Sequence, residues 1–159
     1  MEHEVQTIRI AGIIKQSIVD GPGLRLVVFT QGCPHDCPGC HNPESHDPAG
    51  GYDCPVENIL RELDKNPLLM GITLSGGEPF TRPGELLPLV HAARERGKNI
   101  WCYSGFTFQE LLARAKTSPE TGQLLALLDV LVDGRFVLEK KDLTLRFRGS
   151  RNQRILDVP

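Results

Sequence analysis

Four short apolar runs recur along the chain, and segments with helical periodicity separate them. The runs cover residues 24–30, 71–75, 99–103 and 129–133. Runs of this length predict buried strands. Apolar residues recur at helical spacing in four further segments, at 56–63, 86–93, 107–115 and 119–128. Strands that alternate with helices in this way predict parallel βαβ units and therefore an α/β fold.

The length of the chain limits how these units can close. A chain of 159 residues suits one domain. Four units are too few for a closed eight-stranded barrel, which needs about 200 residues or more. We therefore expect a single domain over residues 1–159, built as an open, incomplete parallel β/α barrel. Within it, 1–17 is interpreted as an N-terminal extension, 43–55 as a loop and 135–159 as a basic C-terminal segment.

Charge and composition exclude several classes of protein. The net charge of −2 gives no general case for nucleic-acid binding. No apolar run approaches the roughly 20 residues of a membrane helix, so a membrane partner is not expected. The acidic start lacks the apolar stretch of a secretory signal, which predicts the cytoplasm. The charge is uneven, because residues 135–154 hold seven of the 18 Lys and Arg residues but two of the 20 Asp and Glu residues.

Three cysteines, Cys33, Cys37 and Cys40, lie within eight residues. Such a group in the cytoplasm indicates metal or redox chemistry rather than disulfides. Three thiolates can hold a [4Fe–4S] cluster with one iron open to a substrate. Zinc is the second interpretation, with His35 or His41 as a fourth ligand. The third is a redox or haem-attachment motif at Cys37–His41, which leaves Cys33 unexplained.

Two further cysteines stand apart from this group. Cys54 lies in the Pro/Gly-rich stretch, and Cys102 lies in an apolar run. Free cysteines commonly behave as small buried hydrophobic residues, and we expect this of both. The alternative for Cys54 is a fourth ligand to a cluster.

The cysteine group and a glycine pair follow neighbouring predicted strands. The first strand leads into Cys33, the second into Gly76-Gly77-Glu78 and the third into Ser104. Carboxyl ends of parallel strands meet at one edge of the sheet, where ligands bind. Two glycines also allow a ligand to approach the backbone closely. These residues are therefore predicted to form one site.

Several stretches of the sequence resemble the radical S-adenosylmethionine (SAM) family, and within it the activases of glycyl radical enzymes. The stretches are 19–25 (VDGPGLR), 28–33 (VFTQGC) and 37–44 (CPGCHNPE). Three more narrow the resemblance to the activases that serve anaerobic ribonucleotide reductase: 101–105 (WCYSG), 129–136 (DVLVDGRF) and 148–153 (RGSRNQ). One position departs from the pattern, because Gly39 stands where many members carry an aromatic residue.

The resemblance implies a set of metal and cofactor residues. Three irons of a [4Fe–4S] cluster would be bound by Cys33, Cys37 and Cys40, and the fourth iron by SAM. The methionine end of SAM would lie along Gly76, Gly77 and Glu78, and the adenosyl part along Gly39, Cys40 and His41. Ser104 and Asp133 are further candidates for SAM contact, although Asp133 next to Gly134 equally fits a turn cap.

The resemblance also implies a reaction and its partners. One electron, supplied by a flavodoxin or ferredoxin, would cleave SAM into methionine and a 5′-deoxyadenosyl radical. That radical would remove a Cα hydrogen from a glycine of the large subunit of anaerobic (class III) ribonucleotide reductase. The alternatives are activation of pyruvate formate-lyase or another glycyl radical enzyme, or a radical SAM reaction on a small molecule. A zinc-binding module without catalysis is the alternative from another class.

The basic C-terminal segment carries candidates for partner docking. Its apolar residues Leu143, Leu145 and Phe147 alternate with polar ones, which predicts an edge strand with one basic face. Arginines can bind a carboxylate with a two-pronged guanidinium. We therefore predict that Arg148, Arg151 and Arg154 dock the partner or contact SAM.

Overall fold

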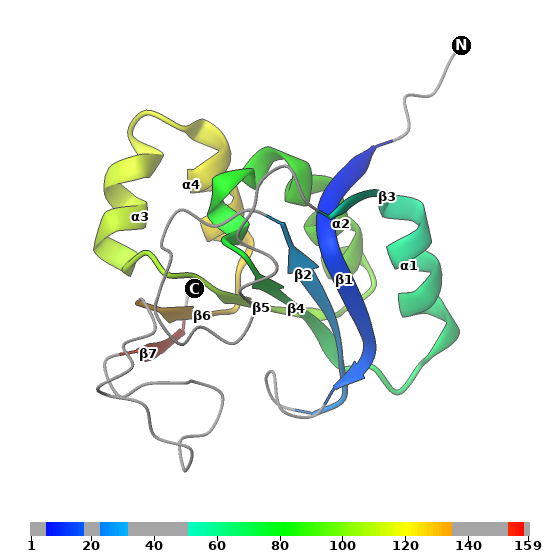
Figure 1. Ribbon diagram of the computed structural model, residues 1–159. Coiled ribbons are helices and arrows are strands. Elements are labelled where there is room, and N and C mark those ends of the chain that lie inside the picture. The colour runs from blue at the N-terminus through cyan, green and yellow to red at the C-terminus, as the bar shows by residue number, and fades with distance from the viewer. Residues whose placement is uncertain (1–5, 18–22, 32–50, 135–152, 158–159) are drawn as a thin grey trace.

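Seven strands form one sheet in the order β3-β1-β2-β4-β5-β6-β7 (Figure 1). The computed structural model describes residues 6–17, 23–31, 51–134 and 153–157. The strands are β1 (Thr7–Ser17), β2 (Arg25–Thr30), β3 (Tyr52–Pro55), β4 (Gly71–Gly76), β5 (Asn99–Tyr103), β6 (Val130–Asp133) and β7 (Arg154–Asp157). Among these strands β3 and β7 are the two edges, so the sheet is open.

The centre of the sheet is parallel, as the sequence predicts. β2, β4, β5 and β6 are parallel neighbours, and helices connect the last three of them. The helices are α1 (Val56–Lys65), α2 (Pro83–Glu95), α3 (Phe108–Ala115) and α4 (Pro119–Leu127), with a short 3-10 helix, η2 (Pro79–Thr81). The prediction of an α/β fold with an open parallel sheet is confirmed.

Both faces of the parallel strands are buried. In one layer Val28, Leu74, Cys102 and Leu131 are register neighbours, and all four belong to the core cluster that includes the helices. Residues one position earlier or later in the strands lie on the opposite face of the sheet. There Trp101, Val130 and Val132 form a second, smaller cluster. Because side chains alternate along a strand, continuous apolar runs such as Leu26–Val28 fill both faces. All four helices lie on one side of the sheet in Figure 1.

A fully buried arginine, Arg25, begins β2. Its Nε donates to Thr73 Oγ1 at 2.8 Å, and Nη2 donates to the carbonyls of Ile72 and Asn99 at 2.8 and 3.2 Å. Burial lowers the pKa of this guanidinium to about 10, and the negative charges of Tyr103 and Asp129 oppose that shift. Arg25 therefore ties the starts of β2, β4 and β5 together.

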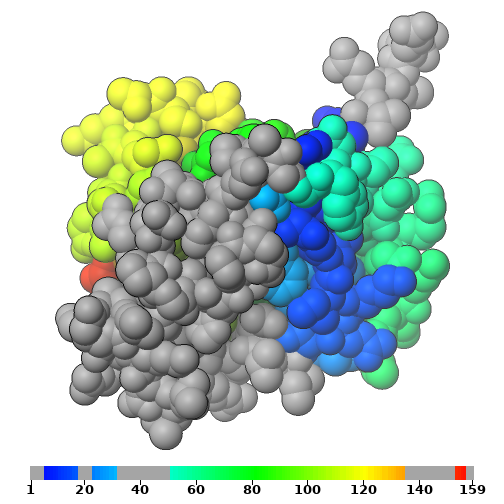
Figure 2. All heavy atoms as spheres, viewed as in Figure 1, coloured from blue at the N-terminus to red at the C-terminus, as the bar shows by residue number. Residues whose placement is uncertain are grey.

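Three of the described strands lie where the sequence did not predict them. One is β7, which forms from residues 154–157 of the basic C-terminal segment and pairs antiparallel with β6. Residues 7–17, interpreted as an extension, form β1, which pairs antiparallel with β2 and β3. Residues 52–55, predicted as loop, form β3 against 7–10. The pairing of β1 with β2 shifts register on either side of Gly12–Ile14, which obscures the alternation of β1 in the sequence. Figure 2 shows β1 and β3 at the surface of the molecule at this end of the sheet.

Local sequence signals explain where helices begin. Thr107 and Glu110 form a capping box at the start of α3, with bonds of 3.1 and 3.0 Å. Ser118 accepts from the Thr121 N–H and caps α4. Each cap satisfies a backbone donor that the first helical turn leaves without a partner. Within the described ranges, no helix has the length and apolar character needed to cross a membrane.

Candidate functional site

The carboxyl ends of the four parallel strands lie along one edge of the sheet. They lead into Gln31, Gly76–Gly77, Ser104 and Gly134. The structure thus places the predicted residues Gly76, Gly77, Glu78, Ser104 and Asp133 at one edge. The other predicted site residues lie outside the described residues: Cys33, Cys37, Gly39, Cys40, His41, Arg148 and Arg151. The proposed edge strand at 143–147 lies outside them as well.

The first joint of this edge connects β2 with β4. The Gly77 N–H donates to the Thr30 carbonyl at 2.8 Å, and Thr30 Oγ1 donates to the Ser75 carbonyl at 3.1 Å. Gly76 has a φ of +93°, and a Cβ at this position would lie 2.4 Å from the Thr30 nitrogen. A side chain at Gly76 would therefore push β4 away from the strand that leads into the cysteine group. The absence of a side chain at Gly76 therefore allows the backbone of β4 to pack directly against the backbone of β2.

Glu78 is the centre of the second joint, between β4 and β5. Its side chain is 1% exposed. Oε2 accepts from Ser104 Oγ at 2.9 Å and from the Phe80 N–H at 3.1 Å, and Oε1 accepts from the Gly105 N–H at 2.7 Å. A buried carboxylate needs such donors, because desolvation without them is costly. Glu78 thus fixes the loop after the glycine pair to the loop after β5.

Ser104 carries the network on to β6. Its hydroxyl oxygen accepts from the Phe106 N–H at 3.1 Å, and its own N–H donates to the Val132 carbonyl at 2.9 Å. The Gly134 N–H in turn donates to the Phe106 carbonyl at 3.3 Å. The ends of β2, β4, β5 and β6 are therefore joined by a continuous series of hydrogen bonds, which we call the rim.

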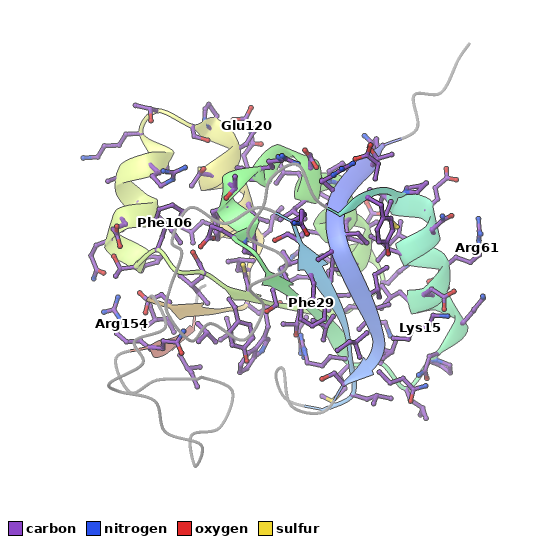
Figure 3. All side chains as sticks on the ribbon, in the orientation of Figure 1. Lys15, Phe29, Arg61, Phe106, Glu120 and Arg154 are labelled. Atoms are coloured by element: carbon purple, nitrogen blue, oxygen red, sulfur yellow. The ribbon has the colours of Figure 1, made fainter. Side chains whose placement is uncertain are left out.

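Asp133 and Arg154 are paired with each other at the end of the rim. Asp133 is fully buried, and the Arg154 guanidinium donates to both of its carboxylate oxygens, from Nε at 2.9 Å and from Nη2. The hydrogen bond with Asp133 is the main cause that raises the pKa of Arg154. Asp133 Oδ2 also accepts from the Phe108 N–H at 2.7 Å. The Arg154 side chain is still 44% exposed, beside β6 and β7 in Figure 3.

Both cysteines in the described part of the chain are buried, as predicted. Cys54 lies on β3 and is separated from β2 by β1 in the sheet. Burial raises the pKa of the Cys54 thiol, and burial followed by the charge of Glu78 raises the pKa of the Cys102 thiol. Metals bind the thiolate rather than the thiol. At both residues burial therefore disfavours the thiolate form that a metal ligand needs.

Some residues of this edge carry no signal in the sequence. Thr30 and Gly105 contribute backbone groups, which no side-chain motif reveals. Gln153 donates to the Gly134 carbonyl at 3.1 Å. The pairing of Asp133 with Arg154 joins residues 21 positions apart on antiparallel strands. A single sequence holds no local pattern for such a contact.

Comparison with known proteins identifies the class of protein. Residues 19–156 match the family described as "4Fe-4S single cluster domain". The anaerobic ribonucleoside-triphosphate reductase-activating protein of Escherichia coli K12 is 38% identical over 86% of this chain and 90% of its own length. The protein of the same name from Enterobacteria phage T4 is 32% identical over 86% of each chain. The chain belongs to the 4Fe–4S single-cluster domain family and to the family of these activating proteins.

A solved structure supports the fold. The chain resembles the crystal structure of QueE from Escherichia coli with a TM-score of 0.53 at 16% identity. The match covers 64% of this chain and 54% of QueE. At this level of identity the likeness concerns the fold alone.

The described part of the site is compatible with a cluster held by the cysteine group. Three thiols at the spacing x3 and x2 form a compact donor set for iron. The strand that leads into them ends at Thr30, which is bonded to Gly77. Burial raises the pKa of both thiols in the described part of the chain, which disfavours the thiolate that binds a metal.

Proposed function

We propose that this protein activates anaerobic ribonucleotide reductase by generating a glycyl radical on the reductase. The observation that carries the proposal is the similarity to activating proteins over 86% of the chain and 90% of the relative. The match to the 4Fe–4S single-cluster family, over residues 19–156, spans the cysteine group and every strand of the rim. We assign Cys33, Cys37 and Cys40 as the cluster ligands. We assign SAM as the cofactor that binds beside them.

The residues of the chain would bind and orient this cofactor. Gly76 and Gly77 are assigned to the methionine end, because the pair follows β4 at the sheet edge and is bonded to the end of β2, which leads into the cysteine group. Gly39, Cys40 and His41 are assigned to the adenosyl part. A cluster held by these cysteines would supply, when reduced, the one electron needed for cleavage of SAM, and the radical chemistry on the target glycine would follow from that cleavage. The rim keeps the surrounding backbone fixed while this occurs.

The roles of Glu78, Ser104 and Asp133 are proposed to be indirect. Their side chains accept from or donate to groups of their own chain. These bonds support the loops that would surround SAM. The partners are proposed to be the large subunit of the reductase and a flavodoxin or ferredoxin as electron donor. The cytoplasm is the proposed location, because its reduced thiols suit cluster ligation.

The experiment begins with protein reconstituted with iron and sulfide without oxygen. Dithionite and SAM are added, with and without the reductase, and 5′-deoxyadenosine and the glycyl radical signal are measured. We expect 5′-deoxyadenosine in both arms and a radical signal when the reductase is present. The control variant Cys37→Ala should give neither, whereas Cys54→Ala should give both.

Other outcomes would identify the alternatives. A radical on pyruvate formate-lyase but not on the reductase would change the target. Consumption of a small molecule, with no protein radical, would indicate a small-molecule radical SAM enzyme. Zinc in place of iron, with no 5′-deoxyadenosine, would overturn the proposal and leave a metal-binding module.

A further inference from the structure

The pair formed by Asp133 and Arg154 joins three elements at one point. Asp133 ends β6, and Arg154 begins β7 directly opposite it. The Phe108 N–H at the start of α3 donates to the same carboxylate. Arg154 Nη2 also donates to Gln109 Oε1 at 2.9 Å, in the first turn of α3. The guanidinium thus holds β7 and α3 against the end of β6.

This point is connected directly to the candidate site. The turn between β5 and α3 contains Gly105, whose N–H is bonded to Glu78, and Phe106, whose carbonyl accepts from Gly134. The turn is therefore held at one end by Glu78 and at the other by Asp133. Figure 3 shows Phe106 and Arg154 on the side of the molecule where α3 lies.

Two nitrogens of Arg154, Nε and Nη2, donate hydrogen bonds to side chains of the same protein. A two-pronged contact with a carboxylate fixes the orientation of a guanidinium as well as its charge. Asp133 is fully buried, so loss of the arginine would leave a buried carboxylate without its cation. This geometry differs from that of an arginine held free for an acidic partner, which is one of the two roles predicted from the sequence; the other is contact with SAM.

We propose that Arg154 is a positioning residue, which holds the turn between β5 and α3 in place for SAM binding and does not dock the partner. The SAM part rests on the proposed function. Removal of the guanidinium is expected to loosen residues 104–109 and to weaken SAM binding. Affinity for the reductase should be unaffected.

The first test uses the chain without cluster and measures amide hydrogen exchange. Arg154→Gln is compared with Lys116→Gln, which removes an exposed cation from the end of α3. We expect faster exchange in peptides covering 104–109 in Arg154→Gln and unchanged exchange in α1. Unchanged exchange at 104–109, or equal acceleration in α1, would overturn the proposal. The result does not depend on cluster chemistry.

The second test separates positioning from docking in the reconstituted protein. In the absence of reductase, Arg154→Gln should raise the KM for SAM about tenfold, the scale at which lost supporting contacts weaken a bound group, with kcat within about twofold. Arg154→Lys should recover part of the lost SAM affinity, because it keeps a positive charge beside Asp133. The recovery should be incomplete, because an ammonium cannot bridge both carboxylate oxygens. Lys116→Gln should match the wild type.

Two results of this second test would count against the proposal. An unchanged KM for SAM with weaker reductase binding would make Arg154 a docking residue. A fall in kcat alone would reflect a smaller folded fraction. If Arg154→Gln does not fold, Gln109→Ala removes the contact with α3 alone and should raise the KM about twofold to threefold. If the wild type itself releases no 5′-deoxyadenosine, the proposed function fails, and the exchange result still decides the role of Arg154.

Discussion

The Ser104 hydroxyl donates to Glu78 Oε2 at 2.9 Å and joins the ends of β4 and β5 inside the protein. The two residues are 26 positions apart, and both are buried. Their contact places the loop after the glycine pair beside the loop that begins α3. The geometry of the candidate site thus depends on a polar network that the protein maintains without a ligand.

Replacement of Glu78 by glutamine should destabilise the protein. One carboxylate oxygen would become an amide donor that faces the N–H of Gly105 or the donors of Ser104 and Phe80. We expect the free energy of unfolding to fall by about 3 kcal/mol, since bonds to a charged group contribute about 1.5–3 kcal/mol. Urea denaturation measures this. Glu95→Gln, at an exposed position of α2, should stay within about 0.5 kcal/mol of the wild type.

The contact between Glu78 and Ser104 can be measured by a double-mutant cycle. Ser104→Ala removes a donor to Glu78 and the acceptor of the Phe106 N–H. The effects of Ser104→Ala and Glu78→Gln should not add, with a coupling energy of about 1–2 kcal/mol. Additive effects would show that the two residues act independently. The geometry of the candidate site could then not be attributed to the hydrogen bonds of the rim.

Gly76 and Gly97 form a matched pair for testing the close approach of β2 and β4. Both have positive φ, +93° and +74°, but a Cβ would meet nothing within 4 Å at Gly97. Gly97→Ala should therefore cost only the strain of φ, about 1–2 kcal/mol. Gly76→Ala adds a clash with the backbone of β2 and should cost about 3–5 kcal/mol. Equal losses of unfolding free energy would contradict the steric explanation.

Iron binding should be independent of the buried cysteines. Cys54→Ala is expected to keep the wild-type content of iron and acid-labile sulfide after reconstitution, because its thiol pKa is raised by burial. Cys37→Ala should lose most of both. Iron and sulfide analysis of the two variants decides this, and loss of iron in Cys54→Ala would make Cys54 a ligand.

Asp64 should stabilise the protein in a pH-dependent manner. Its carboxylate accepts from Arg96 Nε at 2.7 Å and Nη2 at 3.2 Å, and this bonding lowers the pKa of Asp64. A lowered folded pKa gives stability above the usual carboxyl pKa of about 4, and this is lost as the pH falls through the folded value. Asp64→Asn should therefore melt below the wild type at about pH 6 and match it at about pH 2. A difference in Tm that does not change with pH would exclude this linkage.

The sequence by itself determined the local features of the protein. Alternating apolar runs and helical patterns predicted the central parallel sheet, because a buried strand and an amphipathic helix have different periods. The helix at 107–115 was predicted from helical spacing, and α3 (Phe108–Ala115) lies there. The glycine pair and Glu78 were correctly placed at the carboxyl edge, since parallel strands end on one side. These features depend on residues close together in the chain.

Tertiary structure alone decided the contacts between distant segments. The edge strand β3 and its neighbour β1 pair antiparallel across more than 40 residues, and the irregular register of β1 hides its alternation. The burial of Asp133 against Arg154, and of Glu78 against Ser104 and Gly105, depends on which chain ends meet at the edge of the sheet. The sequence alone does not show whether a charged side chain contacts a partner protein or a residue of its own chain. Only the folded geometry shows that Arg154 faces Asp133.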